Sequence, residues 1–289
     1  LKLGVGKIPD ILLDNTDRNR TSPFAFTGNK FEFRAVGSSQ NCAGPMTVLN
    51  GIMADQLIKF KSAVDTLISK GIDKDEAIFQ VLRECIVASK KIRFEGNGYG
   101  EEWVKEAEKR GLSNIKTTPL ALSAFVSKQT MDLFERNGIM SEREQHARYD
   151  IYLETYTKKI QIESRVMADL AMNHIIPTAI KYQSILIDNV RGLKEIMPVA
   201  DFKKSAQIQM EMITEISEHI NTIKTKVDEM TEARRKANTI SDVKQQAIDY
   251  CDKVKSYFDI IRYHVDKLEI LVDDESWPLP KYRELLFTK

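Results

Sequence analysis

The sequence has 289 residues, a length that suits one large domain or two smaller ones. Apolar residues make up 42% and charged residues 29%, and 43 Lys and Arg against 42 Asp and Glu leave a net charge of +1. This balance excludes a global electrostatic field that would attract nucleic acid or an anionic membrane. Three widely separated cysteines, Cys42, Cys85 and Cys251, argue against a disulfide framework or a zinc site. With no signal peptide and no apolar stretch near the roughly 18 residues of a membrane span, the sequence predicts a cytoplasmic protein.

The first part of the chain, to about residue 46, is predicted to form strands and loops, since glycines and prolines are frequent there. It begins at Leu1 without an initiator methionine, so we expect further sequence upstream. The clearest strand signal is the alternation of charged and aromatic residues over 30–34. The aromatic residues fall on one face, and Lys30, Glu32 and Arg34 fall on the other. We therefore expect helices packed behind this strand and a polar cavity in front of it.

Helix-forming residues dominate after that point, and the first helices are predicted to be short or of moderate length. Thr47 is a plausible N-cap for the first helix, and Gly71 suits its C-terminal end. Asp73 is then placed to cap the second helix. Four helical stretches follow from these signals: 47–70, 73–91, 101–109 and 118–137.

A change to long helices is predicted from Ser141 onward. Ser141 and Glu144 fit a capping box, in which each side chain bonds the other residue's backbone N–H. The helix that they open is predicted to run to about Ile196. Pro177 predicts a kink or break within it, and Pro198 predicts its end.

Two further stretches carry apolar residues at alternating spacings of three and four. One runs over 202–230 and the other over 240–272, with a short polar turn between them. Stripes of this kind predict an antiparallel helical hairpin that packs against the preceding long helix. The tail from Ser276 to Phe287 is rich in aromatic residues and proline, and we expect it to dock on its own bundle or on a neighbouring subunit.

One region carries a chemical signal, and it lies near the start of the chain. An Asn19-Arg20 pair on a predicted loop precedes the charged strand face of Lys30, Glu32 and Arg34. A carboxylate among cations stays ionised and can serve as a hard ligand for Mg²⁺ or Mn²⁺. Arginines beside such a metal can neutralise charge on a transferring phosphoryl group. The alternative is a surface strand in which these residues form only a structural ion pair.

The same region resembles the end of the glutamine synthetase catalytic domain, where an Asn-Arg element precedes an R-x-E-x-R strand. The string from Asn19 to Arg34 is most similar to the type III class of that family. So are the loop over 93–99 that leads into Glu101-Glu102-Trp103, and the long helical extension at the C-terminal end. The resemblance covers nearly the whole chain, although its sharpest motifs lie in the first hundred residues. It identifies the sequence as the C-terminal portion of such an enzyme.

The resemblance implies roles for four residues. Glu32 stands where the family has a carboxylate ligand of a metal ion that bridges the ATP phosphates. Arg34 stands where an arginine contacts glutamate and the transferring phosphoryl group, and Arg20 matches an arginine that stabilises the transfer. Lys30 stands where other classes carry a nucleotide-binding arginine, a change that keeps the charge but loses the bidentate fork. Ala25 stands where other classes place a second substrate arginine, so that contact must come from elsewhere.

The resemblance also implies a fold and an activity. The fold class expected is α+β: one or two strands and helices that end a catalytic barrel over 1–140, then a long-helix antiparallel bundle over 141–289. The reaction implied is ATP-dependent ligation of ammonia to L-glutamate, with Mg²⁺ or Mn²⁺ as cofactor and a γ-glutamyl phosphate intermediate. The remaining metal and ammonia-site residues of the family lie upstream of such a segment. A large homo-oligomer, built as dodecamer-like rings with active sites between subunits, is implied as well.

Two other readings remain open from the residues alone. A non-catalytic helical module for oligomerisation or interaction would explain the stripes after about residue 140, but it has no need of the charged strand face. A guanidino transferase of the phosphagen kinase type is less consistent, because the helical extension has no counterpart there. The four histidines, His146, His174, His219 and His264, are widely spaced, and we interpret them as helix-surface or core residues.

Overall fold

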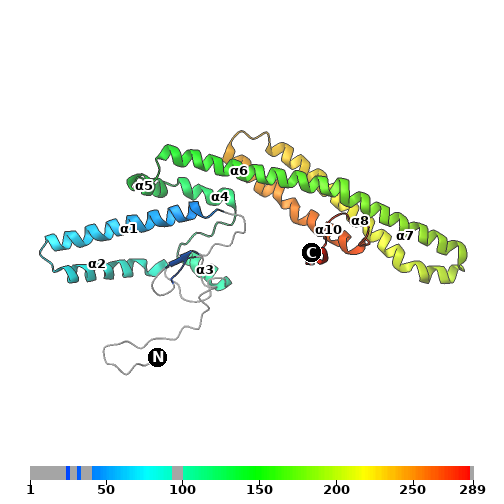
Figure 1. The fold of residues 1–289 in the computed structure, drawn as a ribbon, viewed down its shortest axis with the longest axis horizontal. Coiled ribbons are helices and arrows are strands. Elements are labelled where there is room, and N and C mark those ends of the chain that lie inside the picture. The colour runs from blue at the N-terminus through cyan, green and yellow to red at the C-terminus, as the bar shows by residue number, and fades with distance from the viewer. Residues whose placement is uncertain (1–23, 27–30, 34–40, 93–99, 287–289) are drawn as a thin grey trace, which may run out of the picture. The chain divides into compact units, whose positions relative to one another are not determined.

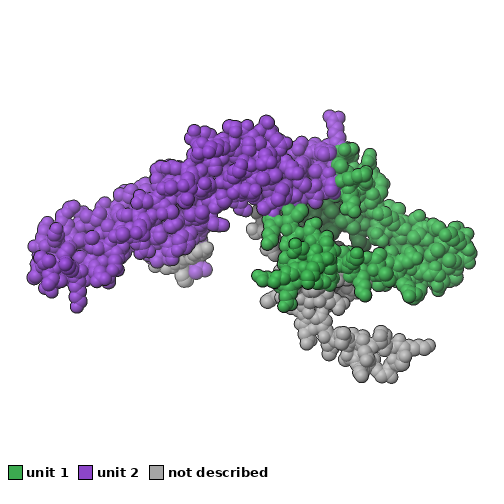
Figure 2. Space-filling model, turned by 180° about the vertical axis from the view of Figure 1, so that it is seen from behind, with its two compact units in different colours: residues 1–116, 128–142 green, residues 117–127, 143–289 purple. Residues whose placement is uncertain are grey.

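The computed structural model describes residues 24–26, 31–33, 41–92 and 100–286 (Figure 1). The chain divides into two compact units, which Figure 2 shows in green and purple. Unit 1 comprises residues 1–116 and 128–142, and unit 2 comprises residues 117–127 and 143–289. Within the described ranges, no helix is both long enough and apolar enough to cross a membrane.

The two described strands form a small hairpin in unit 1. Strand β1 (Phe24–Phe26) pairs antiparallel with β2 (Phe31–Phe33), and the two make a two-stranded sheet. The expected α+β fold that ends a barrel is therefore wrong for the described residues, which are otherwise helical or in turns and loops. Period-2 alternation identified a strand correctly but carries no information about its neighbours. Closing a barrel takes many staggered strands, and the described residues supply two of three residues each.

Unit 1 is built on a pair of antiparallel helices, α1 (Ala43–Ser69) and α2 (Lys74–Ala88). The first begins earlier than predicted, because Thr47 lies inside it and donates its hydroxyl to the Ala43 carbonyl at 2.8 Å. Gly71 ends the helix as expected: its φ of 87° is in the left-handed region, and a Schellman pattern of hydrogen bonds closes the last turn. Asp73 caps α2 by accepting from the Asp75 backbone N–H at 3.0 Å.

Shorter helices complete unit 1, and its buried core is small. A 3-10 turn, η2 (Ser89–Ile92), follows α2, and α3 (Glu101–Lys109) and α5 (Lys128–Arg136) come later in the chain. Val64 of α1 packs with Ala77 and Val81 of α2 to form the one buried cluster between these two helices that the described residues show. Phe134 of α5 is fully buried, and it and Ile139 pack close to Gly51 of α1, where a β-carbon would meet the Ile139 side chain at 2.7 Å.

Unit 2 begins with α4 (Thr118–Leu122) and a 3-10 turn, η3 (Ser123–Val126). Its long element consists of α6 (Glu142–Asp169), a π-helical segment η4 (Leu170–Ile175) and α7 (Ile176–Ile196). The break predicted at Pro177 takes the form of this π segment, which ends one residue before the first turn of α7. Pro177 lacks the backbone N–H that a continuous helix would use, and the π segment just before it is where the regular α-helical hydrogen bonding is interrupted.

The predicted hairpin is confirmed, with one difference. Its first arm is the single helix α8 (Val199–Ala237), which packs against both α7 and α10. The second arm is interrupted: α9 (Val243–Asp249) passes through a π segment, η5 (Tyr250–Val254), and a 3-10 turn, η6 (Lys255–Tyr257), into α10 (Phe258–Leu271). These local changes of helical pitch keep the buried residues facing the core along the whole arm.

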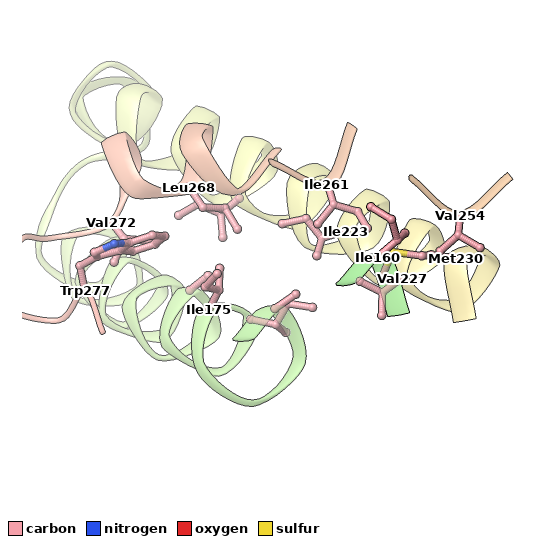
Figure 3. Packing of buried hydrophobic residues seen from close by; sticks show 14 of the residues in the cluster. Ile160, Ile175, Ile223, Val227, Met230, Val254, Ile261, Leu268, Val272 and Trp277 are labelled. Atoms are coloured by element: carbon pink, nitrogen blue, oxygen red, sulfur yellow. The ribbon is translucent and has the colours of Figure 1, made fainter. Parts of the chain in front are cut away.

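The core of unit 2 joins all three long elements, as Figure 3 shows. Ile160 and Ile175 come from the long element, Ile223 from α8 and Ile261 from the second arm. The tail docks on this same bundle: Trp277 is 8% exposed and belongs to the core cluster, and Lys281 donates to the Glu269 carbonyl at 2.8 Å. A last short helix, α11 (Tyr282–Leu286), follows.

Candidate functional site

The predicted catalytic strand is present, and its register is known. Glu32 is the central residue of β2, and its partner across the hairpin is Ala25 of β1. Ala25 stands where other classes of the family are expected to have a second substrate arginine. In the hairpin, this alanine is therefore the cross-strand neighbour of Glu32, the predicted metal ligand. Arg20, Lys30 and Arg34 lie outside the described residues. Their grouping with Glu32 in one site therefore stays a prediction.

A buried carboxylate in unit 1 is held by three donors. Arg136 of α5 donates two hydrogen bonds to the Asp55 carboxylate of α1, from Nε to Oδ1 at 2.6 Å and from Nη2 to Oδ2 at 2.8 Å. Lys59 adds an ion pair at 2.8 Å, and Asn137 donates to Oδ1 at 3.2 Å. The Arg136 and Lys59 hydrogen bonds hold the pKa of the Asp55 carboxyl far below its usual range, and Asp55 in turn raises the pKa of Arg136. With its oxygens taken up by these donors, Asp55 fastens α5 to α1 and is poorly placed to bind a substrate.

A histidine pair in unit 2 was missed by the sequence analysis. Nδ1 of His219 on α8 lies 2.8 Å from Nδ1 of His264 on α10. Burial and the neighbouring His219 together lower the pKa of His264. Glu215 approaches Nε2 of His219 no closer than 3.7 Å, and the Tyr263 ring packs edge-on against His264. The signal was available: each histidine flanks an apolar stripe of the predicted hairpin, but pairing them needs the register between its arms.

A polar network near the turn between α8 and α9 is structural. The fully buried Tyr250 donates its hydroxyl to the Asn238 side chain at 2.6 Å, and Gln161 of α6 bonds both residues, at 3.2 and 3.1 Å. Burial raises the pKa of the Tyr250 hydroxyl. The network fastens the hairpin turn to the long element and satisfies polar atoms that would otherwise be buried without partners.

A hollow of about 530 Å³ lies between α6 with η4, α10 and the tail. Its lining is mainly apolar and includes Met167, Phe258 and Trp277. Arg262 and Asp266, which are ion-paired at 2.6 Å, also line it. The hollow therefore has the character of an apolar surface recess, and it holds none of the residues predicted for catalysis.

A complete metal centre cannot be assembled from the described part of the chain. Those residues contain no group of three or more His, Cys, Asp or Glu side chains that could hold an ion. Glu32 remains the candidate metal ligand of this chain.

Residues 77–194, from α2 into α7, match the profile of the glutamine synthetase C-terminal domain family. Over all 289 residues the chain is 53% identical to a glutamine synthetase of Bacteroides fragilis (strain YCH46), covering 40% of that protein. Over its whole length, the chain is therefore similar to a glutamine synthetase.

Two further relatives support the class within the family. A type-3 glutamine synthetase of Dictyostelium discoideum is 34% identical over the whole of this chain, which covers 39% of it. A glutamine synthetase of Butyrivibrio fibrisolvens is 32% identical over 95% of this chain, which covers 38% of it. The recognition of a type III glutamine synthetase is thus confirmed. The chain spans about two fifths of the length of these curated relatives.

Proposed function

We propose that this chain is part of an ATP-dependent glutamate–ammonia ligase, that is, of a glutamine synthetase that makes L-glutamine. The observation that carries the proposal is the 53% identity to a glutamine synthetase over an alignment that spans all 289 residues. A second support is the resemblance of the strand sequence around Glu32 to the family's R-x-E-x-R element, from which it departs only in having Lys30 in place of the first arginine. The helical interaction module gains no comparable support, because the similarity extends through the strand region as well as the helices.

The chemistry of the reaction explains why these residue types are needed. A carboxylate is a poor acyl donor, because its leaving group would be oxide. The γ-carboxylate of glutamate therefore attacks the γ-phosphorus of ATP, ADP leaves, and an acyl phosphate forms. Ammonia then attacks the acyl carbon and forms a C–N bond. The bond between that carbon and the phosphate oxygen breaks, phosphate leaves with the electron pair, and the nitrogen loses a proton. Two anions must meet in the first step, so cationic groups are needed to offset their repulsion.

We assign this task to four residues. Arg20 and Arg34 neutralise charge on the transferring phosphoryl group, and Arg34 also holds the glutamate substrate. Lys30 offers a point charge to the nucleotide phosphates in place of the fork that an arginine would give. Glu32 supplies a carboxylate oxygen of the kind that Mg²⁺ or Mn²⁺ prefers. When bound, such an ion polarises phosphoryl oxygens and orients the two anions.

The fit of a metal to this chain is partial. Glu32 is one hard oxygen donor, whereas Mg²⁺ takes six ligands, of which protein side chains commonly supply one or two and water or phosphate the rest. The described residues hold no group of three or more His, Cys, Asp or Glu side chains that would form a protein-only site. We therefore propose that the other protein ligands and the ammonia site come from the part of the enzyme that this chain does not cover.

The setting of the enzyme is proposed on the same basis. We infer a cytoplasmic enzyme that assembles as a large homo-oligomer of dodecamer-like rings. The substrates are L-glutamate, ammonia and ATP. The mixed, near-neutral charge of the chain is consistent with small polar substrates rather than a polyanionic partner.

A chimera tests the activity directly. The segment of the Bacteroides fragilis enzyme that aligns with this chain is replaced by this chain, and glutamine formation is assayed with ATP, Mg²⁺, glutamate and ammonia. We expect ATP-dependent glutamine formation within about tenfold of the parent enzyme, since roughly half of the exchanged residues are identical. A soluble chimera of parental oligomeric mass that makes no glutamine would contradict the proposal.

A further inference from the structure

Helix α2 carries apolar residues on two opposite sides. On one side Ala77 and Val81 are buried against α1, at 0% and 5% exposure. On the other side Phe79, Leu82 and Ile86 follow the spacing i, i+3, i+7 and so share one face of the helix. These three side chains are 61%, 46% and 46% exposed. The residues Phe79, Leu82 and Ile86 are called the outer face of α2 below.

The outer face is unusual for a helix at the surface of a folded protein. A surface helix normally has one apolar stripe towards the core and a polar face towards water, whereas a helix that is apolar on two sides is typical of a buried layer. Single exposed apolar residues need no explanation, but a contiguous row of large ones marks an interaction site. Helix α2 therefore has the sequence of a middle layer, with α1 as the layer on one side.

The helix pair formed by α1 and α2 is also weakly supported on its own. Its buried cluster consists of three residues, Val64, Ala77 and Val81. Helix α1 has further apolar side chains open to solvent, among them Met53 and Leu57 at 45% and 61% exposure. A core of this size gives a helical pair little stability, because most helical stability comes from packing of an apolar face. More apolar surface must be covered for the pair to be firmly held.

The longer chains of the relatives indicate what can cover the outer face of α2. The chain covers 40%, 39% and 38% of its three relatives, so most of each glutamine synthetase lies outside the matched region. The match to the family profile begins at residue 77, inside α2, and carries on through the outer face. The outer face thus lies in a region similar to a domain that, in these relatives, is part of a much longer chain.

We propose that the outer face of α2 docks on the remaining part of the glutamine synthetase chain, as the packing surface between the two. The occupant is an apolar layer of that remaining part. A second copy of this chain is the competing occupant. The proposal depends on family membership and on exposure, and it holds whether or not the assembled protein makes glutamine.

Hydroxyl-radical footprinting with mass spectrometry tests the proposal without any substitution, since it reports the exposure of side chains. It is applied to this chain alone and to the chimera with the Bacteroides fragilis enzyme. We expect oxidation of Phe79, Leu82 and Ile86 to fall roughly tenfold in the chimera, as half-exposed side chains become buried. Ile180 and Ile185 of α7, exposed by 48% and 60%, are the internal controls and should keep their oxidation.

The outcomes separate the two occupants. Equal oxidation of the outer face in the chain alone and in the chimera overturns the proposal. Protection that is already present in the chain alone, and that disappears on dilution, assigns the face to a second copy and overturns it too. Glutamine formation is not the readout, so a chimera that is protected but inactive counts against the proposed function and not against the docking surface.

Substitution gives a second, independent test. In the chimera, Phe79, Leu82 and Ile86 are changed together to serine, and Ile180, Ile185 and Ile187 of α7 serve as the matched triple control. We expect the outer-face variant to lose at least about tenfold of its soluble assembled yield, and the α7 variant to keep it. In the chain alone, the outer-face variant should keep its helical circular dichroism, because these side chains are 46% to 61% exposed there. Full assembly of the outer-face variant would contradict the proposal.

Discussion

Asp55 illustrates at the residue scale how this chain uses charge to join segments that are far apart in sequence. Its carboxylate lies 81 positions before Arg136 and is bound by it in a bidentate pair, with Lys59 and Asn137 as further donors. Such planar, two-pronged pairing fixes orientation as well as distance. The contact therefore sets how α5 lies on α1.

The pH dependence of this pair follows from the lowered pKa of Asp55. A carboxyl whose pKa is lower in the folded state contributes stability that is fully present above its unfolded pKa, about 3.9. That contribution is lost as the pH falls towards the folded pKa. We expect Asp55→Asn to lower the melting temperature at pH 7 and the difference from the parent to shrink below about pH 4. Thermal melts between pH 7 and pH 2 measure this.

Asp65→Asn is the matched control, because Asp65 lies on the same helix and pairs with Lys61 at the exposed surface. Exposed pairs contribute little, so this variant should melt close to the parent. A parent and an Asp55→Asn variant with the same melting temperature at pH 7 would show that the pair does not hold the helices.

The histidine pair predicts a loss of stability with falling pH in unit 2, in a higher pH range than for Asp55. His219 and His264 can share one hydrogen bond while at most one of them is charged, and two charges at 2.8 Å repel. Burial and His219 lower the pKa of His264 in the folded state. A histidine with a lowered folded pKa contributes stability above its unfolded pKa of about 6.5 and loses it as the pH falls.

We therefore expect unit 2 to lose stability between pH 7 and pH 5, and His264→Phe to remove part of that loss. Histidine titration by NMR and melts across this range measure both effects. His174→Phe, at an exposed position on η4, should retain the full pH dependence. An unchanged profile for His264→Phe would exclude the pair as its source.

The helical elements of unit 2 gain their stability from one continuous core, which gives a prediction at the element scale. Ile223 of α8 is 0% exposed and faces the long element and the second arm. Ile223→Ala should destabilise unit 2 by about 2–5 kcal/mol, through lost apolar burial and a cavity. On the same helix, Ile208 is 70% exposed, and Ile208→Ala should change stability by no more than about 0.5 kcal/mol. Denaturant unfolding compares the two, and equal effects would contradict the packing described.

Sequence periodicity predicted the long elements well because each has a strong one-sided pattern. Alternating spacings of three and four placed the hairpin, and Pro198 and Gly71 ended helices where expected. The interruptions at Tyr250–Tyr257 could not be predicted, since a π or 3-10 turn shifts the register without changing residue type. Thr47 was misplaced as a cap because its hydroxyl can equally bond a carbonyl one turn earlier, inside the helix.

Contacts between distant segments account for the rest of the difference. The Asp55–Arg136 and His219–His264 pairs depend on which helices are neighbours and on the register between them. The spacing of residues within one helix predicts neither property. The barrel expectation failed for the same reason: alternation over 30–34 identifies a strand, whereas the strands beside it are a long-range property. Of the candidate site, only the strand position of Glu32 was predicted and then described.

At the scale of the whole molecule, we predict that the helical bundle of unit 2 contributes to assembly of the homo-oligomer. Deleting 200–275 is a poor test, because those residues supply most of the buried core of unit 2. Ile208 and Met210 of α8 are 70% and 49% exposed and offer a gentler change. If α8 contributes to ring contacts, Ile208→Lys with Met210→Lys should lower the oligomer mass of the chimera while the melting temperature holds. Light scattering measures the mass, and an unchanged mass would remove this surface from the assembly.

The proposed function depends on the carboxylate of Glu32 on β2 as a metal ligand. Removing that charge in the chimera is the most direct test of this role. Glu32→Gln keeps the size of the side chain but removes the charge that would bind the divalent ion. We predict a loss of at least about 100-fold in glutamine formation, together with a higher Mg²⁺ requirement, while oligomer mass stays the same. Glu195→Gln, at an exposed position on α7, should remain fully active. A Glu32→Gln chimera with parental activity and an unchanged Mg²⁺ requirement would contradict the proposed role of Glu32 as a metal ligand.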